Sequence, residues 1–114
     1  MARLLIDTTV FIDHLRGREL IRPRGNNLAY SVIVRAELYT GGDERRIDIM
    51  LDRYEELPVD RAVAERAGRL RRDTKIDMAD ALIAATALVH GFTVITRNVA
   101  DFRGVSKLRA RSEI

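Results

Sequence analysis

The chain has 114 residues, of which 46% are hydrophobic and 32% charged, a composition typical of one globular domain. It contains no cysteine, which excludes a disulfide framework and a thiolate metal site, and its longest apolar run, residues 81–89, is far shorter than the roughly 20 residues of a membrane span. The formal net charge of +3 and the sequence pI of about 9.8 are compatible with a nucleic acid partner.

Short apolar runs bounded by turn residues predict the strands. The clearest is Leu4-Leu5-Ile6, a continuous apolar run typical of a buried parallel strand, which ends abruptly at Asp7. A strand near Pro58 must be brief and at the edge of the sheet, because proline cannot donate a ladder hydrogen bond. The expected strands are residues 4–6, 28–30, 57–59, 92–95 and a weakly alternating segment within residues 105–114.

Apolar residues at helical spacing predict the helices between these strands. The strongest amphipathic pattern covers residues 43–55 and includes Tyr54. Ser31 and Asp60 are placed to cap the helices that follow them. The expected helices are residues 10–15, 32–39, 43–55, 61–72 and 77–90, and turn-forming residues predict a loop over residues 17–27.

The alternation of strands and helices predicts an α/β fold. We expect three layers, with a central, mainly parallel sheet of about four to five strands and helices on both of its faces. No linker, repeat or low-complexity segment interrupts the pattern. Residues 1–114 are therefore expected to form a single domain.

Four carboxylates are candidates for a common site. Asp7 and Asp101 follow predicted strands, Glu37 lies in the helix after the second strand, and Asp80 begins the long apolar helix. The carboxyl ends of parallel strands meet at one edge of a sheet, so these acids are expected to converge there. Carboxylates collected at one place raise one another's pKa unless a cation compensates them, and a hard divalent ion such as Mg²⁺ or Mn²⁺ suits oxygen ligands.

Each acid also has a purely structural explanation. Asp77 and Asp80 can cap the helix and interact with its dipole, and Asp77 is an additional acid beside the expected site. Glu37 can be an exposed helical acid, and Asp101 can cap a turn. Only Asp7, directly after a buried apolar run, indicates a function by itself. The hypothesis of a metal site therefore depends on the whole set.

The basic residues are nearly all arginine and are clustered. A solvated helix face explains such clusters as well as a surface that binds RNA phosphates or an acidic partner does. The clusters are Arg66 to Lys75, Arg16 to Arg24, and a C-terminal group of Lys107, Arg109 and Arg111.

Four segments in this order resemble a PIN domain, and more narrowly the VapC toxins of toxin–antitoxin systems. The segments are LLIDTTVFIDHL, SVIVRAELYTG, DALIAATAL and VITRNVADF. The resemblance implies a compact, metal-dependent endoribonuclease that cuts tRNA, rRNA or mRNA by metal-assisted hydrolysis and inhibits translation and growth. It further implies a homodimer held inactive by a VapB-like antitoxin. The composition, without cysteine or a long apolar run, separately favours a cytoplasmic protein with no membrane association.

The resemblance also implies roles for individual residues. The catalytic and metal-binding set is Asp7, Glu37, Asp80 and Asp101. Thr9, Thr96 and Asn98 match the polar positions that support these acids. Arg97 resembles a basic residue often found in the loop TRNVADF and is a candidate for contact with an RNA phosphate, whereas Arg69 and Arg72 are such candidates because they lie in the basic segment Arg66 to Lys75.

Two alternatives remain open at this stage. A phosphoacceptor receiver domain has a similar length and an acidic pocket, but it also needs a basic residue after a later strand, and none is suitably placed. A noncatalytic PIN-like module would bind RNA or a partner without cutting, although carboxylates without a metal contribute nothing to phosphate binding. The chain is somewhat shorter than usual for the family around residues 17–27 and in the middle helices, regions that commonly contact antitoxin and RNA.

Overall fold

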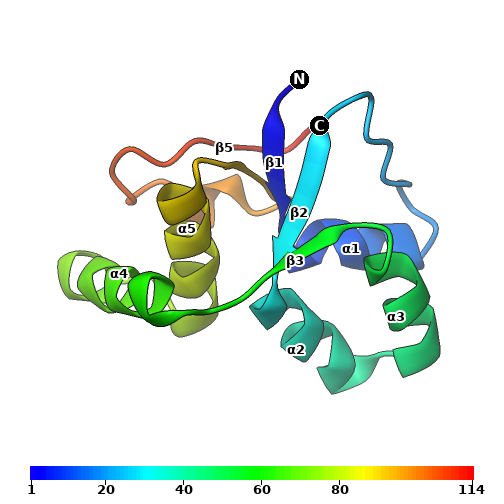
Figure 1. The fold of residues 1–114 in the computed structure, drawn as a ribbon, viewed down its shortest axis with the longest axis horizontal. Coiled ribbons are helices and arrows are strands. Elements are labelled where there is room, and N and C mark those ends of the chain that lie inside the picture. Colours follow the sequence, from blue (N-terminus) through cyan, green and yellow to red (C-terminus); the bar gives the residue numbers. More distant parts are fainter.

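A five-stranded sheet forms the centre of the computed structural model, which describes residues 1–114 (Figure 1). The strand order is β3-β2-β1-β4-β5, and all four pairings are parallel. The predicted parallel α/β fold is therefore confirmed. The strands are β1 (Arg3–Ile6), β2 (Asn27–Ser31), β3 (Glu55–Leu57), β4 (Thr93–Ile95) and β5 (Ala110–Arg111).

Helices cover both sides of the sheet, with α4 and α5 on one side and α1 and α3 on the other (Figure 1). This division follows from the chain path, because the connections run from β1 outwards to β3 and then return across the sheet to β4, and crossovers between parallel strands are nearly always right-handed. The helices are α1 (Thr8–Leu15), α2 (Val32–Gly41), α3 (Glu44–Leu51), α4 (Arg61–Asp73) and α5 (Met78–His90), with a short 3-10 turn η1 at Val99–Phe102.

The structure corrects the predicted boundary between the third helix and the third strand. The helix expected over residues 43–55 ends at Leu51, and β3 begins at Glu55, where it pairs with Ala29 of β2. Tyr54 therefore lies outside the helix, with its ring centroid 5.9 Å from that of Phe11. Because the ring of Tyr54 packs against the core, the apolar residues seemed to continue at helical spacing. The pairing of residues 55–57 with β2 instead makes this segment a strand.

The core is one cluster of 28 buried residues centred on β1 and α5. Leu4, Leu5 and Ile6 of β1 are fully buried between the two helical layers. Helix α5 is apolar on nearly all sides, because it lies between the sheet and α4. This helix therefore begins at a position set by tight packing, at the same edge of the sheet where β1 ends (Figure 1). None of the helices has the length and apolar character that a bilayer crossing requires.

Gly91 ends α5 in the left-handed conformation, with φ 75° and ψ 43°. We expect Gly91→Ala to lower the free energy of unfolding by about 1–2 kcal/mol, because an L side chain is strained in this region. A Cβ here would meet only Arg3, at 3.7 Å, so the effect is conformational. Urea unfolding measures it. Gly68→Ala, on the open face of α4, should instead leave stability unchanged or raise it, and equal losses in both variants would contradict the assignment.

Candidate active site

Asp7 lies at the junction of β1 and α1 and is only 4% exposed. Its backbone N–H donates to the carbonyl of Ile95 at 2.9 Å, which holds the end of β1 against the end of β4. Its Oδ2 accepts two hydrogen bonds, from the hydroxyls of Thr9 at 2.9 Å and Thr96 at 2.8 Å. The other carboxylate oxygen, Oδ1, has no hydrogen bond within the chain and remains available to a ligand.

The loop after β4 is joined to α1 at this carboxylate. The backbone N–H of Arg97 donates to the Thr9 hydroxyl at 3.0 Å, and that of Asn98 donates to the Thr96 hydroxyl at 3.0 Å. Both hydroxyls that hold Asp7 are therefore oriented by the backbone of the loop. A hydroxyl that accepts a hydrogen bond from an amide points its own proton elsewhere. Both hydroxyls are therefore held with their O–H bonds directed at the carboxylate of Asp7.

A second group of acids surrounds the start of α5. Asp77 is the N-cap, and its Oδ1 accepts from the backbone N–H of Asp80 at 2.9 Å, which is the structural role that the sequence left open for it. Asp77, Asp80 and Asp101 line an open depression of about 420 Å³ beside η1. The other residues that line this depression are Thr74, Lys75, Ile76, Gly104 and Val105.

Electrostatics connect the two groups. Burial, followed by the charges of four other carboxylates, raises the pKa of Asp80 from its ordinary value of 3.8 to about 7. In decreasing order of effect these carboxylates belong to Asp77, Asp7, Asp101 and Glu37. All the acids selected from the sequence thus lie within electrostatic reach of Asp80, and no basic side chain offsets the rise in the pKa of Asp80.

The acids do not meet at a single point, however. Glu37 stands on the exposed face of α2, and neither it nor Asp7 lines the depression beside Asp80. No three Asp, Glu or His side chains are close enough together to form a complete metal cluster. The structure also reveals a contact that the sequence did not predict, because the Thr8 hydroxyl donates to Glu37 Oε1 at 2.6 Å. The position of Thr8 directly after Asp7 was the only feature of the sequence that placed this hydroxyl near the acids.

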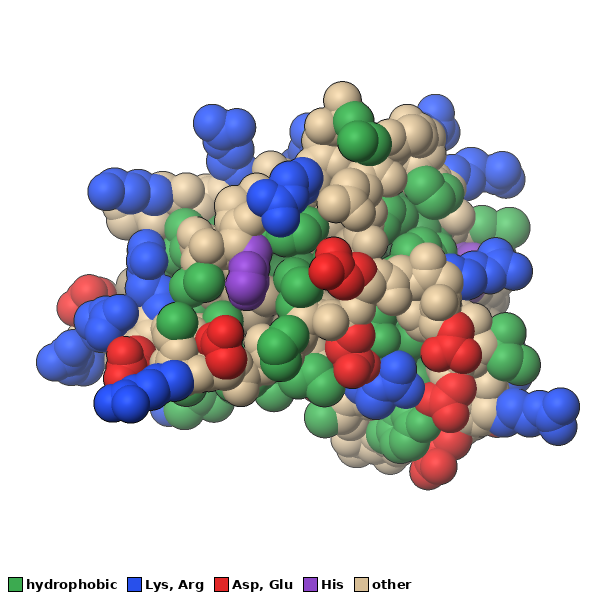
Figure 2. Space-filling model, in the orientation of Figure 1, with side chains coloured by type: hydrophobic (Ala, Val, Ile, Leu, Met, Phe, Trp, Pro, Cys, Tyr) green, Lys and Arg blue, Asp and Glu red, His purple; other side chains and the backbone are tan.

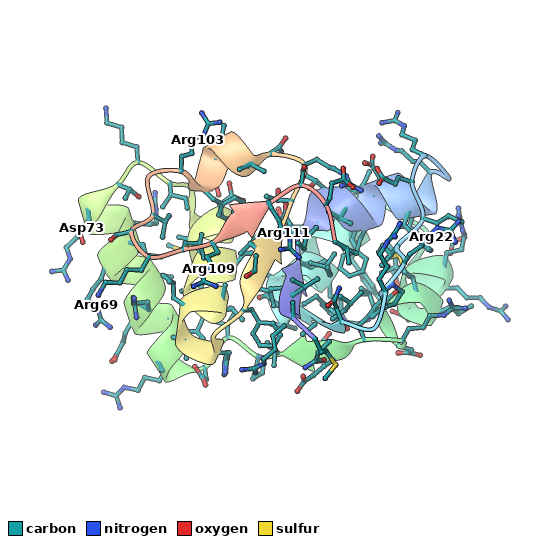
Figure 3. The ribbon with its side chains drawn as sticks, turned by 90° about the horizontal axis from the view of Figure 1, so that it is seen from above. Arg22, Arg69, Asp73, Arg103, Arg109 and Arg111 are labelled. Atoms are coloured by element: carbon teal, nitrogen blue, oxygen red, sulfur yellow. The ribbon has the colours of Figure 1, made fainter.

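The arginines expected to contact RNA differ in their surroundings. Arg69 and Arg72 are exposed on α4, and Arg69 points outwards from the helix (Figure 3). Arg97 differs from them, because its guanidinium is already paired with Asp13 at 3.0 Å and Glu19 at 3.1 Å. A phosphate contact by Arg97 would require these ion pairs to break.

Comparison with known proteins places this chain in one family. The model of the PIN domain matches residues 4–108. Ribonuclease VapC19 of Mycobacterium tuberculosis is 37% identical, in an alignment that covers 86% of this chain and 90% of the relative. The family match over residues 4–108 includes both groups of acids and the loop after β4.

Solved structures have the same fold. A toxin–antitoxin complex from Klebsiella pneumoniae contains a chain with a TM-score of 0.74 and 29% identity, and the match covers 100% of both chains. A DNA-bound VapBC complex from Salmonella typhimurium contains a chain with a TM-score of 0.83 and 23% identity, covering 97% of this chain and 98% of that one. Because the family model spans nearly the whole chain and the relatives agree with it, the chain belongs to the PIN-domain family, in the VapC group.

Proposed function

We propose that this chain is the endoribonuclease toxin of a VapBC-type toxin–antitoxin pair, which hydrolyses RNA phosphodiester bonds with the help of Mg²⁺ or Mn²⁺. The observation that carries this proposal is the half-buried carboxyl of Asp80 with four further carboxylates around it, since burial first and then their charges raise its pKa to about 7. Such a site is unfavourable for folding unless a cation binds there. The relatives named as VapC ribonucleases provide the reaction class.

The donor set suits a hard divalent ion. The ligands available are carboxylate oxygens, and Asp7 offers an oxygen that no hydrogen bond occupies. Mg²⁺ is usually held by one or two carboxylates and retains several waters, so three converging acids are not required. We propose that Asp7, Asp80 and Asp101 hold one or two such ions, directly or through bound water, with Glu37 completing the shell or orienting the attacking water. The ion supplies a polarised water and neutralises charge on the phosphate.

The protein side chains have distinct tasks in this reaction. Thr9 and Thr96 fix the orientation of Asp7, while Thr8 fixes that of Glu37, so the acids need little rearrangement when substrate binds. Neither histidine is placed to act with these carboxylates, since His14 accepts a hydrogen bond from the backbone N–H of Ile21 and His90 ends α5, at the opposite end of the helix from Asp80. Water is therefore the nucleophile that we propose.

RNA binding must overcome the negative charge of the site. Basic side chains stand around much of the outline of the molecule (Figure 2), and Arg69 and Arg72 on α4 are the contacts that we propose for the RNA backbone. Phosphate contacts of this kind make affinity depend steeply on salt concentration. The chain has three tyrosines, three phenylalanines and no tryptophan, so shape and phosphate recognition should dominate over base stacking.

The proposed partner is a VapB-like antitoxin, because several solved relatives are VapBC complexes. We further propose that residues 1–114 act as one PIN domain, that the toxin is a homodimer in the cytoplasm, and that RNA cleavage inhibits translation and growth. A short neighbouring gene that encodes a DNA-binding protein, and co-purification of that protein with this chain, would support the toxin–antitoxin pairing.

We expect the purified chain to cut RNA with Mg²⁺ or Mn²⁺, and EDTA to abolish cleavage. Glu37→Gln should lower kcat by about 10–100-fold, the range typical when a group that orients a metal shell is lost. Gel assays with structured tRNA, rRNA and mRNA fragments measure both effects. Glu65→Gln is the matched control, because Glu65 lies on α4 and only pairs with Arg61. RNA binding without cleavage in every metal condition would instead indicate a noncatalytic module.

A further inference from the structure

Arg97 joins three parts of the chain that are distant in sequence. Its Nε donates to Asp13 of α1 at 3.0 Å, and its Nη2 pairs with Glu19 of the following loop at 3.1 Å. Its Nη1 donates to the carbonyl of Ser112 in the C-terminal segment. The side chain is only 22% exposed. Every nitrogen of the guanidinium therefore has a partner within the chain.

The backbone of the same residue reaches the proposed active site. The N–H of Arg97 donates to the hydroxyl of Thr9, which in turn donates to Oδ2 of Asp7. We infer that Arg97 is a positioning residue for Asp7. Its side chain fixes the loop after β4 against α1, and its N–H transmits that position to the carboxylate through Thr9. This inference rests on the function proposed above.

The side chain adds to the backbone contacts of the loop an anchor on α1, on the loop after α1 and on the C-terminal segment. Residues 96–98 follow β4 directly, and their backbone donors are used on Thr9, Thr96 and the end of β5. A guanidinium with a planar fork of donors can hold several acceptors at once, which a flexible lysine or a neutral side chain cannot. Loss of this clamp lets the loop move by fractions of an ångström, and the Thr9 hydroxyl then no longer orients Asp7.

The C-terminal segment belongs to the same arrangement. A cavity of about 470 Å³ is lined by the loop after α1, by Arg97, and by Glu113 and Ile114. Ser112 immediately precedes these two residues and supplies the carbonyl that Nη1 binds. Seating of residues 112–114 is therefore coupled to the orientation of Asp7, although these residues contact none of the proposed metal ligands.

The test compares Arg97→Ala with Arg18→Ala. Arg18 is a matched control because it also approaches Asp13, at 4.0 Å, but its side chain is 66% exposed and it has no link to Thr9. For Arg97→Ala we expect kcat to fall by about 10–100-fold while the KM for RNA stays within about twofold, since no substrate contact is lost. Arg18→Ala should leave kcat unchanged, and Arg97→Lys should recover part of the lost rate.

Two measurements on the free protein are independent of activity. Mn²⁺ titration should show affinity weakened by a factor of the same size as the loss in kcat, and hydrogen exchange of the Arg97 and Asn98 amides should accelerate. If Arg97→Ala does not fold, Asp13→Asn and a chain ending at Arg111 remove single partners of the guanidinium. Both should change the same quantities in the same direction, by smaller factors.

The outcomes separate this inference from the proposed function. A raised KM for RNA, a smaller salt dependence and an unchanged kcat in Arg97→Ala would make Arg97 an RNA contact and overturn the positioning role. Unchanged Mn²⁺ affinity and amide exchange would also overturn it. If the unmodified chain cuts no RNA with any metal, the proposed function fails, and the Mn²⁺ and exchange measurements still decide whether Arg97 positions Asp7.

Discussion

Asp7→Asn is expected to reduce metal-dependent RNA cleavage by about 1,000-fold or more. The substitution keeps the size of the side chain and an oxygen that can accept from Thr9 and Thr96, but it removes the negative charge at the buried end of β1. Metal ions contribute several kcal/mol of charge stabilisation to such reactions, and each 1.36 kcal/mol corresponds to a tenfold change in rate. Single-turnover cleavage of a labelled RNA in Mg²⁺ measures the loss.

Stability provides the internal control for this substitution. Asp7 is 4% exposed, so removal of its charge should leave the thermal midpoint unchanged or raise it in the absence of metal, a common outcome at active sites. Asp73→Asn is the matched variant, because Asp73 lies at the end of α4 with its side chain in solvent (Figure 3). Full cleavage activity in folded Asp7→Asn protein would refute the proposed metal site.

Asp80→Asn is expected to abolish cleavage and also to change how stability depends on pH. The folded pKa of Asp80, about 7, exceeds its ordinary value of 3.8 because of burial and the neighbouring acids. Between these two values the folded state binds the proton more tightly than the unfolded state does. The free energy of unfolding therefore falls as pH rises from about 4 to about 7, and it is lowest above pH 7.

The variant should be more stable than the unmodified chain at pH 8 and similar to it near pH 4. The difference at pH 8 is expected to be about 1–2 kcal/mol, a value reduced to allow for solvent screening at a half-buried group. Urea unfolding without metal at several pH values measures it. Mg²⁺ should also stabilise the unmodified chain at pH 8 more than it stabilises Asp80→Asn. Identical pH profiles for the two proteins would contradict the electrostatic account of the site.

Local patterns predicted most elements of the fold. Ser31 and Asp60 cap α2 and α4 as expected, and each accepts a hydrogen bond from a backbone N–H of its helix. The end of the third helix was predicted wrongly, because the apolar spacing continued to Tyr54 after the helix had ended at Leu51. The spacing of apolar residues indicates which side chains face the core. A residue in a turn, such as Tyr54, can pack its ring against the core as well as a helical residue can.

The sequence by itself determined the family and the parallel α/β layout, and it singled out four acids as candidates for a metal site, because each of these depends on residues that are close together in the chain. Only the tertiary structure decided the environment of these acids. It assigned Asp77 to a helix cap, paired Thr8 with Glu37 across 29 positions, and connected Arg97 to Thr9 across 88 positions. Such contacts depend on the packing of the whole sheet and its helices, and no local pattern of residues encodes them.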